Sequence, residues 1–177
     1  MVLIVITKAP MQLSIFLKQR QKQQKSIQLW FKRLRRNTRI NLDPYFHQAH
    51  DAVFKNTDCM KCAHCCATTS PIFYQKDIDR AALALHIKPG EFIERYLEMD
   101  EEGDFVFTQT PCPFLQADHA CSIYKDRPKA CREYPHTNRK QIRQLLTITE
   151  KNTQVCPAVL QIVNQIQERF KADGITI

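Results

Sequence analysis

The sequence predicts a mainly α-helical protein with short β segments, in which a small, irregular, metal-stabilised cysteine-cluster domain is preceded by a basic helical arm. Three observations predict this fold class. Apolar residues recur at helical spacing in several segments, strand-like patterns are short, and all eight cysteines lie after residue 58. With 177 residues, of which 44% are hydrophobic, the chain is large enough for one modest core. We therefore expect an arm over residues 1–42 and the cysteine-cluster domain over residues 43–177.

The arm is strongly basic. It contains five lysines and five arginines and no acidic residue, a charge of +10, so the remaining residues sum to −2 within the formal net charge of +8. From Met11 to Arg36, strong helix formers dominate and glycine and proline are absent, which predicts a helix. Two interpretations remain: contact with an anionic membrane surface or nucleic acid, or a solvated helix that docks through Trp30, Phe31 and Leu34. Met11 is also a second candidate start.

The domain is expected to begin with a helix. Asp43-Pro44 is typical of a helix N-terminus, and the apolar spacing that follows predicts a helix over residues 44–56. Residues 58–68, which carry the first cysteines, are predicted to form a loop. The patterns that follow predict an extended piece over 71–74, helices over 77–85 and 89–97, and a strand over 105–108. An apolar stripe predicts a last helix that begins at Cys156-Pro157 and ends near Gly174.

The cysteines form one ordered pattern, with four of them compressed into eight positions. Two-residue gaps let one turn of backbone direct successive thiolates at one point, as in zinc sites and iron–sulfur loops. The predicted metal ligands are Cys59, Cys62, Cys65, Cys66, Cys112, Cys121, Cys131 and Cys156. The alternatives are a disulfide scaffold and buried inert thiols. Disulfide-rich domains usually carry a secretion signal, and the apolar stretch over residues 2–6 is too short for one or for a membrane span, so we expect a cytoplasmic location.

The ligands divide in more than one way. In an extended segment Cys65 and Cys66 would point to opposite sides, so we expect them not to serve one ion in the same way. That arrangement favours either two four-thiolate sites or one cluster beside a reactive thiol pair. Cys112 and Cys156, each followed by proline, are candidates for the remote ligand of a [4Fe–4S] cluster, whereas two closed zinc sites would use the same eight sulfurs. Zinc and an iron–sulfur cluster are therefore both candidate cofactors.

Basic and histidine side chains lie between the cysteines. Four basic residues are candidate hydrogen-bond donors to the thiolate sulfurs: Lys61, Arg127, Lys129 and Arg132. Such hydrogen bonds would lower the pKa of the cysteine ligands. Three histidines are near cysteines in sequence but are expected to stay outside the ligand set: His64, His119 and His136.

The cysteines and the residues between them resemble a known family. The matching motifs are Cys59-x-x-Cys62-x-x-Cys65-Cys66, Cys112-Pro113-Phe114-Leu115, Cys121-Ser122-Ile123-Tyr124, Arg127-Pro128-x-x-Cys131-Arg132-x-Tyr134-Pro135 and Cys156-Pro157. Together they resemble the YkgJ-like cysteine-cluster family, a zinc- or iron-chelating domain with a CxxCxxCC motif, over about residues 55–160. The resemblance implies a cytoplasmic metal-chelating domain. Some relatives with the same cluster are flagellin lysine N-methylases, which are larger than this chain.

Two functional classes follow. The first is a cytoplasmic metal-binding protein that chelates zinc or an iron–sulfur cluster through the eight cysteines. The alternative is a metal-dependent enzyme, with redox chemistry or, by the resemblance, protein lysine methyl transfer. The chain has three glycines and neither the GxGxxG nor the GxxxxGK phosphate-loop pattern, which argues against a nucleotide cradle and favours the metal-binding module.

Overall fold

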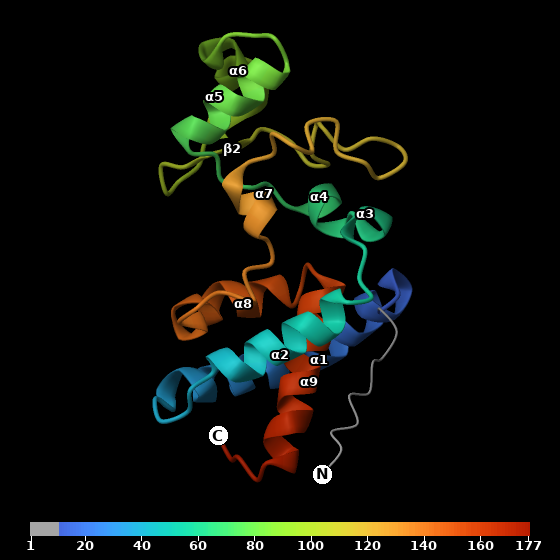
Figure 1. Ribbon diagram of the computed structural model, residues 1–177, viewed down its shortest axis with the longest axis vertical. Coiled ribbons are helices and arrows are strands. Elements are labelled where there is room, and N and C mark those ends of the chain that lie inside the picture. The colour runs from blue at the N-terminus through green and yellow to red at the C-terminus, as the bar shows by residue number, and fades with distance from the viewer. Residues whose placement is uncertain (1–10) are drawn as a thin grey trace. The chain divides into compact units, whose positions relative to one another are not determined.

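A computed structural model describes residues 11–177 and confirms the predicted mainly α-helical fold with short β segments (Figure 1). The chain divides into two compact units. The first unit combines the chain up to Asp58 with Pro135–Ile177, and the second unit is the continuous stretch Cys59–Tyr134. The predicted boundary between residues 42 and 43 falls within the first unit. The part of the predicted arm over residues 1–10 lies outside the described residues.

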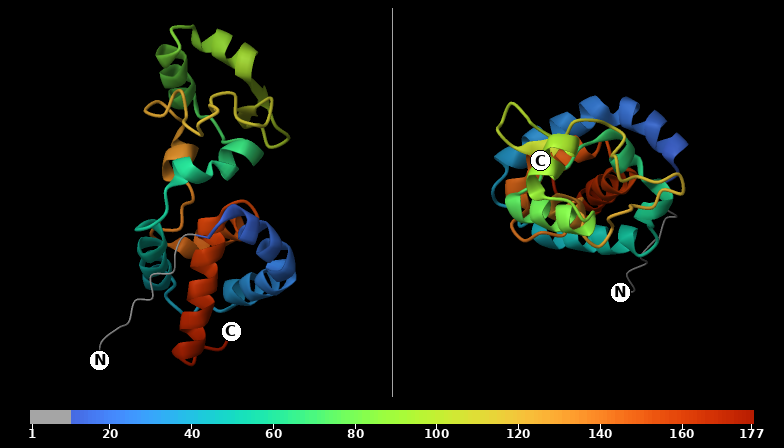
Figure 2. Two further views of the ribbon diagram at one scale, coloured as in Figure 1. Left: turned by 90° about the vertical axis from the view of Figure 1, so that its right-hand side faces the viewer. Right: turned by 90° about the horizontal axis from the view of Figure 1, so that it is seen from above.

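Helix α1, Leu13–Arg36, confirms the helix predicted for the arm. One face of α1 is buried, through Phe16, Ile27, Phe31 and Leu34. This face packs against α8, Leu146–Asn152, and α9, Pro157–Ala172. Trp30 meets Phe31 edge-on, with 5.0 Å between the ring centroids. The prediction that this helix docks through Trp30, Phe31 and Leu34 is therefore confirmed. Figure 2 (left) shows α1, in blue, beside α9, in red.

The first unit is completed by helices from both of its chain segments. Helix α2, Asp43–Phe54, has proline in its first turn, as predicted, and it packs against α9, Pro157–Ala172. The predicted apolar stripe of α9 is buried: Val159, Ile162, Val163, Ile166 and Phe170. Gly174 has a positive φ of 67°, and its N–H donates to the Lys171 carbonyl, which ends the helix as glycine commonly does.

The sequence patterns did not predict the 3₁₀ helix η1, Ile142–Leu145, or helix α8, Leu146–Asn152. Both are short, and α8 contains β-branched residues that lower intrinsic helix propensity. They are stabilised by burial, since Ile142 and Leu146 lie in the core of the first unit. Tertiary packing therefore outweighs the weak local preference.

His50 of α2 is a partly buried titratable side chain of the first unit. Its ring stacks on Phe54 with 4.4 Å between centroids, and its Nδ1 lies 2.8 Å from the Thr137 hydroxyl. Burial lowers the pKa of His50, and nearby His47 adds to the fall, whereas Asp51 opposes it.

We expect the free energy of unfolding to decrease as the pH falls below about 6.5, because the unfolded chain then takes up a proton that the folded state binds more weakly. Urea titrations between pH 5 and 8 measure this slope. His50→Gln should flatten it, and His86→Asn, at an exposed position of the second unit, should leave it unchanged. Equal slopes for all three proteins would contradict the assignment to His50.

In the second unit, two of the helices and a small sheet surround a group of aromatic side chains. Helices α5, Gln75–Ala84, and α6, Pro89–Tyr96, confirm the two predicted helices. Strands β1, Leu97–Met99, and β2, Phe105–Phe107, pair antiparallel. The predicted strand is thus present, whereas β1 was missed because the helix prediction continued to residue 97. The extended piece over 71–74 pairs with β2 through one isolated bridge, between Phe73 and Phe105.

Each unit has its own apolar core. The core of the second unit includes Phe73, Phe92, Phe107 and Phe114, and Cys112 and Cys121 pack against it. Among residues 11–177, no helix combines the length and the hydropathy that a membrane span requires.

Candidate metal centre

Two short helices carry the first four cysteines, so the prediction of a loop over residues 58–68 is wrong. Helix α3 is Cys59–Cys62 and helix α4 is His64–Thr68. The N–H of Ala63 donates to the Cys59 carbonyl at 2.9 Å, and Ala63 itself has a left-handed backbone that separates the two helices. Helices of four and five residues leave no apolar periodicity for a sequence pattern to detect.

The helical conformation also corrects the expectation for Cys65 and Cys66. Both residues lie on α4, so the premise of an extended segment is wrong, and their Sγ atoms are 4.0 Å apart. Two sulfurs on one tetrahedral zinc ion are about 3.8 Å apart, given Zn–S bonds of about 2.3 Å. A disulfide would need about 2.0 Å. The spacing of these two sulfurs therefore fits two ligands of one ion.

A backbone hydrogen bond attaches the loop that carries Cys112 and Cys121 to α4. The Cys112 N–H donates to the Cys66 carbonyl at 2.8 Å. Cys121 is brought back toward Cys112 by a tight hairpin, in which Leu115 and Cys121 form an antiparallel bridge. The Ser122 N–H donates to the Phe114 carbonyl at 2.9 Å and completes the hairpin. Two cysteines that are distant from α4 in the sequence are thus positioned by backbone contacts.

The position of Cys131 on α7, Lys129–Glu133, depends on a buried carboxylate. Asp77 of α5 is 3% exposed and accepts hydrogen bonds from the Lys129 N–H at 3.0 Å and from the Arg80 guanidinium at 2.6 Å. Arg80 in turn donates to the carbonyls of Asp126 and Arg127. Asp77 and Arg80 therefore hold the segment that carries Cys131.

Four thiols from separate segments form one electrostatic group: Cys66, Cys112, Cys121 and Cys131. Burial raises the pKa of the Cys131 thiol to about 12, and the other three sulfurs add to the rise. Burial likewise raises the pKa of Cys112 to about 11, with contributions from Cys121 and Cys66. The pKa of Cys66 falls to about 7, mainly because of its hydrogen bond with Cys65. We call these four residues the four-thiol group.

Comparison with known families tests the resemblance that the cysteine motifs indicate. A family model named CxxCxxCC, described as "Putative zinc- or iron-chelating domain", matches residues 58–157, more than half of the chain. This chain belongs to the CxxCxxCC family. The resemblance to a zinc- or iron-chelating cysteine-cluster family is thereby confirmed. No curated protein and no solved structure matches the chain significantly.

Arg127 supplies positive charge to the four-thiol group of this CxxCxxCC domain. Its charge acts to lower the pKa of Cys66, Cys121 and Cys131. The guanidinium lies 3.7 Å from the centroid of the Tyr124 ring, a cation–π contact that fixes its position. Arg127 thus has the charge and the location to offset part of the negative charge that several thiolates would bring.

The other basic residues and the histidines that lie near the cysteines in the sequence have different surroundings in the structure. The Arg132 guanidinium lies 4.0 Å from the Asp77 carboxylate. The backbone of Lys129 contacts the same carboxylate, and Lys61 lies on α3. His64 begins α4, and His119 occupies a left-handed turn position in the hairpin. His136 belongs to the first unit.

Cys156 differs from the other cysteines because it belongs to the first unit. It precedes α9, where its N–H donates to the Asn152 carbonyl at 2.8 Å, and its side chain packs against the core of that unit. The remaining seven predicted ligands lie in the second unit. Within residues 11–177, no three side chains from cysteine, histidine, aspartate and glutamate form a ready-made set of metal ligands. The eight-cysteine ligand set stays a prediction.

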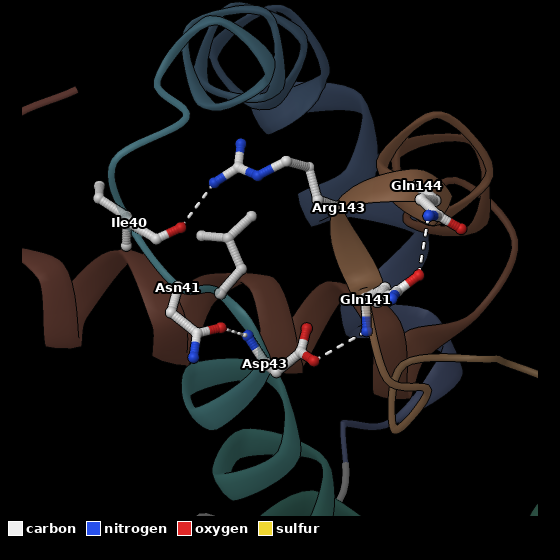
Figure 3. Close-up of a pocket in the computed structure, with 7 residues that line it drawn as sticks. Ile40, Asn41, Asp43, Gln141, Arg143 and Gln144 are labelled. Carbon is white, nitrogen blue, oxygen red and sulfur yellow. Dashed lines mark hydrogen bonds between the residues drawn. The ribbon is translucent and has the colours of Figure 1, made fainter.

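A pocket of about 380 Å³ in the first unit is structural in character (Figure 3). Arg143 donates to the carbonyls of Leu34 and Ile40, at 3.0 and 2.6 Å. The Asp43 carboxylate accepts hydrogen bonds from the N–H groups of Gln141 and Ile142. The charged groups at this pocket therefore join α1, α2 and η1.

Proposed function

We propose that this chain is a cytoplasmic metal-binding protein that chelates zinc or an iron–sulfur cluster through its cysteines, with the four-thiol group among the ligands. The observation that carries the proposal is the backbone arrangement that brings Cys112 and Cys121 to α4, through the hydrogen bond from the Cys112 N–H to the Cys66 carbonyl and the bridge between Leu115 and Cys121. The effect of these sulfurs on the pKa values of Cys112 and Cys131 agrees with this arrangement. A cytoplasmic location suits this chemistry, since thiolate ligands must stay reduced. The enzyme alternative stays a prediction.

The donor chemistry suits both candidate cofactors. Four thiolates are a common ligand set for structural zinc and for [4Fe–4S] clusters. Bound zinc would supply folding free energy through a closed site, and a cluster would add one-electron chemistry. The chain's own residues bind and orient: α4 presents Cys66, the hairpin presents Cys121, and α7 presents Cys131.

Proton release should accompany metal binding. Burial raises the pKa values of Cys112 and Cys131 to about 11 and about 12, so the thiols are protonated near neutral pH without a ligand. A metal ion must displace these protons, which makes its affinity increase with pH. Arg127 favours the ionised state of the same group and so assists the exchange.

Metal analysis and an absorption spectrum after anaerobic purification test the proposal. We expect either bound zinc without visible absorbance or iron and sulfide with a broad visible band. Cys66→Ser and Cys131→Ser should each lose most of the metal, because a hydroxyl is a poor substitute for a soft thiolate. Ala67→Ser adds a hydroxyl to the same helix without removing a thiol, so this control should keep its metal.

Further variants resolve the remaining ligands. Loss of metal in Cys65→Ser together with loss in Cys66→Ser would indicate two closed sites or one site that uses both sulfurs. Cys156→Ser tests the predicted ligand of the first unit in the same assay. Full retention of metal in both Cys66→Ser and Cys131→Ser would disprove the four-thiol ligand set.

A further inference from the structure

Helix α1 carries a straight row of exposed basic side chains that the metal-binding proposal does not use. Along the outer face, side chains recur every three or four residues, which places them in one line. The basic members are Lys18, Lys22, Lys25, Lys32 and Arg36, and all five are exposed. We call these five residues the basic stripe. Ile15 and Leu29 continue the same line and are also exposed.

The stripe faces away from the core of its unit. The opposite face of α1 is occupied by Phe16, Ile27, Phe31 and Leu34, each at most 1% exposed. Because a helix has 3.6 residues per turn, positions between these buried residues must lie on the outer side. The packing therefore fixes the direction in which the five charges point.

The charge of the stripe is not neutralised within the described protein. No acidic residue precedes Asp43 in the sequence. Arg35, on the flank of α1, pairs with Glu150 at 2.7 Å. Among residues 11–177, the five side chains of the stripe have neither an ion pair nor a hydrogen bond, so their charge is available to an external anion.

The length of the row matches an extended polyanion. From Lys18 to Arg36 the helix rises by about 27 Å, at 1.5 Å per residue. Duplex nucleic acid carries one phosphate per about 1.7 Å of its axis, so about 16 phosphates lie within that length. We propose that the basic stripe of α1 binds the phosphate backbone of nucleic acid, without reading its sequence.

A membrane surface fits the same helix less well. A helix that lies in a bilayer interface buries its apolar face 5–10 Å deep, and here that face is already buried in the protein core. Trp30, the aromatic residue best suited to an interface, packs on Phe31 and Phe170 instead. The line of the stripe offers Ile15 and Leu29 for insertion, and the other exposed large apolar side chains of α1, Leu13 and Leu17, lie only at the N-terminal end of the helix.

Fluorescence anisotropy with the full chain tests this proposal. The probes are a labelled 24-base-pair DNA duplex, the same length of single-stranded DNA, and RNA. If five phosphates are contacted, the slope of log affinity against log salt is about −4.5 for the duplex, and affinity falls about 500-fold between 50 and 200 mM salt. The order of affinities among the three probes identifies the preferred nucleic acid.

Two variants with equal loss of charge separate the stripe from net charge. The stripe variant K18Q/K25Q/K32Q/R36Q should lose affinity at least ~100-fold at 50 mM salt and reduce the slope to about −0.9. The control variant replaces four exposed lysines elsewhere, namely Lys55, Lys76, Lys88 and Lys171, with glutamine. It should change affinity less than about threefold, because only long-range attraction is altered.

Three outcomes would overturn the proposal. One is equal weakening by both variants, which would indicate a net-charge effect. Another is the absence of binding to all three nucleic acids at 50 mM salt. The third is binding to vesicles with 30% anionic phospholipid, lost in the stripe variant, while nucleic acid is not bound. Circular dichroism and metal content confirm that each variant is folded, since no predicted ligand lies on α1.

Discussion

Removal of the bound metal is expected to remove hydrogen-exchange protection from α3, α4 and α7 while α1, α2 and α9 stay protected. The first three helices have four or five residues, too few to persist without support. Thiolate–metal bonds contribute about 10 kcal/mol or more to the folding of small zinc peptides. The first unit instead rests on large buried side chains such as Phe16, Phe31 and Phe46, none of which is a ligand.

Hydrogen exchange followed by mass spectrometry, before and after treatment with a chelator and a mild reductant, measures this difference by segment. Reductant alone is the control, because it changes thiol redox state but does not remove zinc. Restoration of protection on adding the metal back would show that the change is reversible. A metal-free protein with unchanged exchange and an unchanged melting temperature would rule out a metal-dependent fold.

Asp77→Asn is expected to lower the free energy of unfolding by about 2 kcal/mol, because the buried carboxylate that accepts hydrogen bonds from the charged Arg80 guanidinium and from the Lys129 N–H is lost. Asp77 is 3% exposed, and it serves both the Arg80 guanidinium and the Lys129 N–H. The change should also loosen the segment that carries Cys131 and speed release of the metal.

Asp79→Asn is the matched control, since Asp79 lies on the same helix but is exposed and accepts a hydrogen bond only from Gln75 among the described contacts. Denaturant unfolding compares the stabilities of the metal-loaded proteins, and transfer of metal to a chromogenic chelator measures release. If Asp77→Asn and Asp79→Asn agree within about 0.5 kcal/mol and release metal equally fast, Asp77 does not support the centre.

Long periodic helices and the cysteine pattern could be predicted from the sequence. Helix α9 was predicted because its apolar residues form one stripe, and α1 because good helix formers run without a break. The spacing of the cysteines indicated metal binding, because both the residue type and the spacing can be seen directly in the sequence. These features depend on neighbours that are close along the chain.

Contacts between distant residues could not be predicted in the same way. Asp77 and Lys129 are 52 positions apart, and no local pattern joins them. One signal for this contact was present in the sequence. Asp77 lies on the same face of α5 as the buried Ala81, and an acidic residue on a buried face is unusual unless it is paired. The conformation of α4 was also missed, and with it the 4.0 Å spacing of Cys65 and Cys66.

The order of the two units along the chain has a consequence for synthesis on the ribosome. Cys59–Tyr134 is continuous, whereas the first unit needs residues from both sides of it. After Tyr134, 43 further residues must be added to reach Ile177 (177 − 134), which takes about 2–9 s at about 5–20 residues per second. Seven cysteines are therefore translated, and their stretch of chain is complete, while α9 does not yet exist. The stretch that carries these cysteines is therefore complete in the chain before the first unit has the residues that close its core.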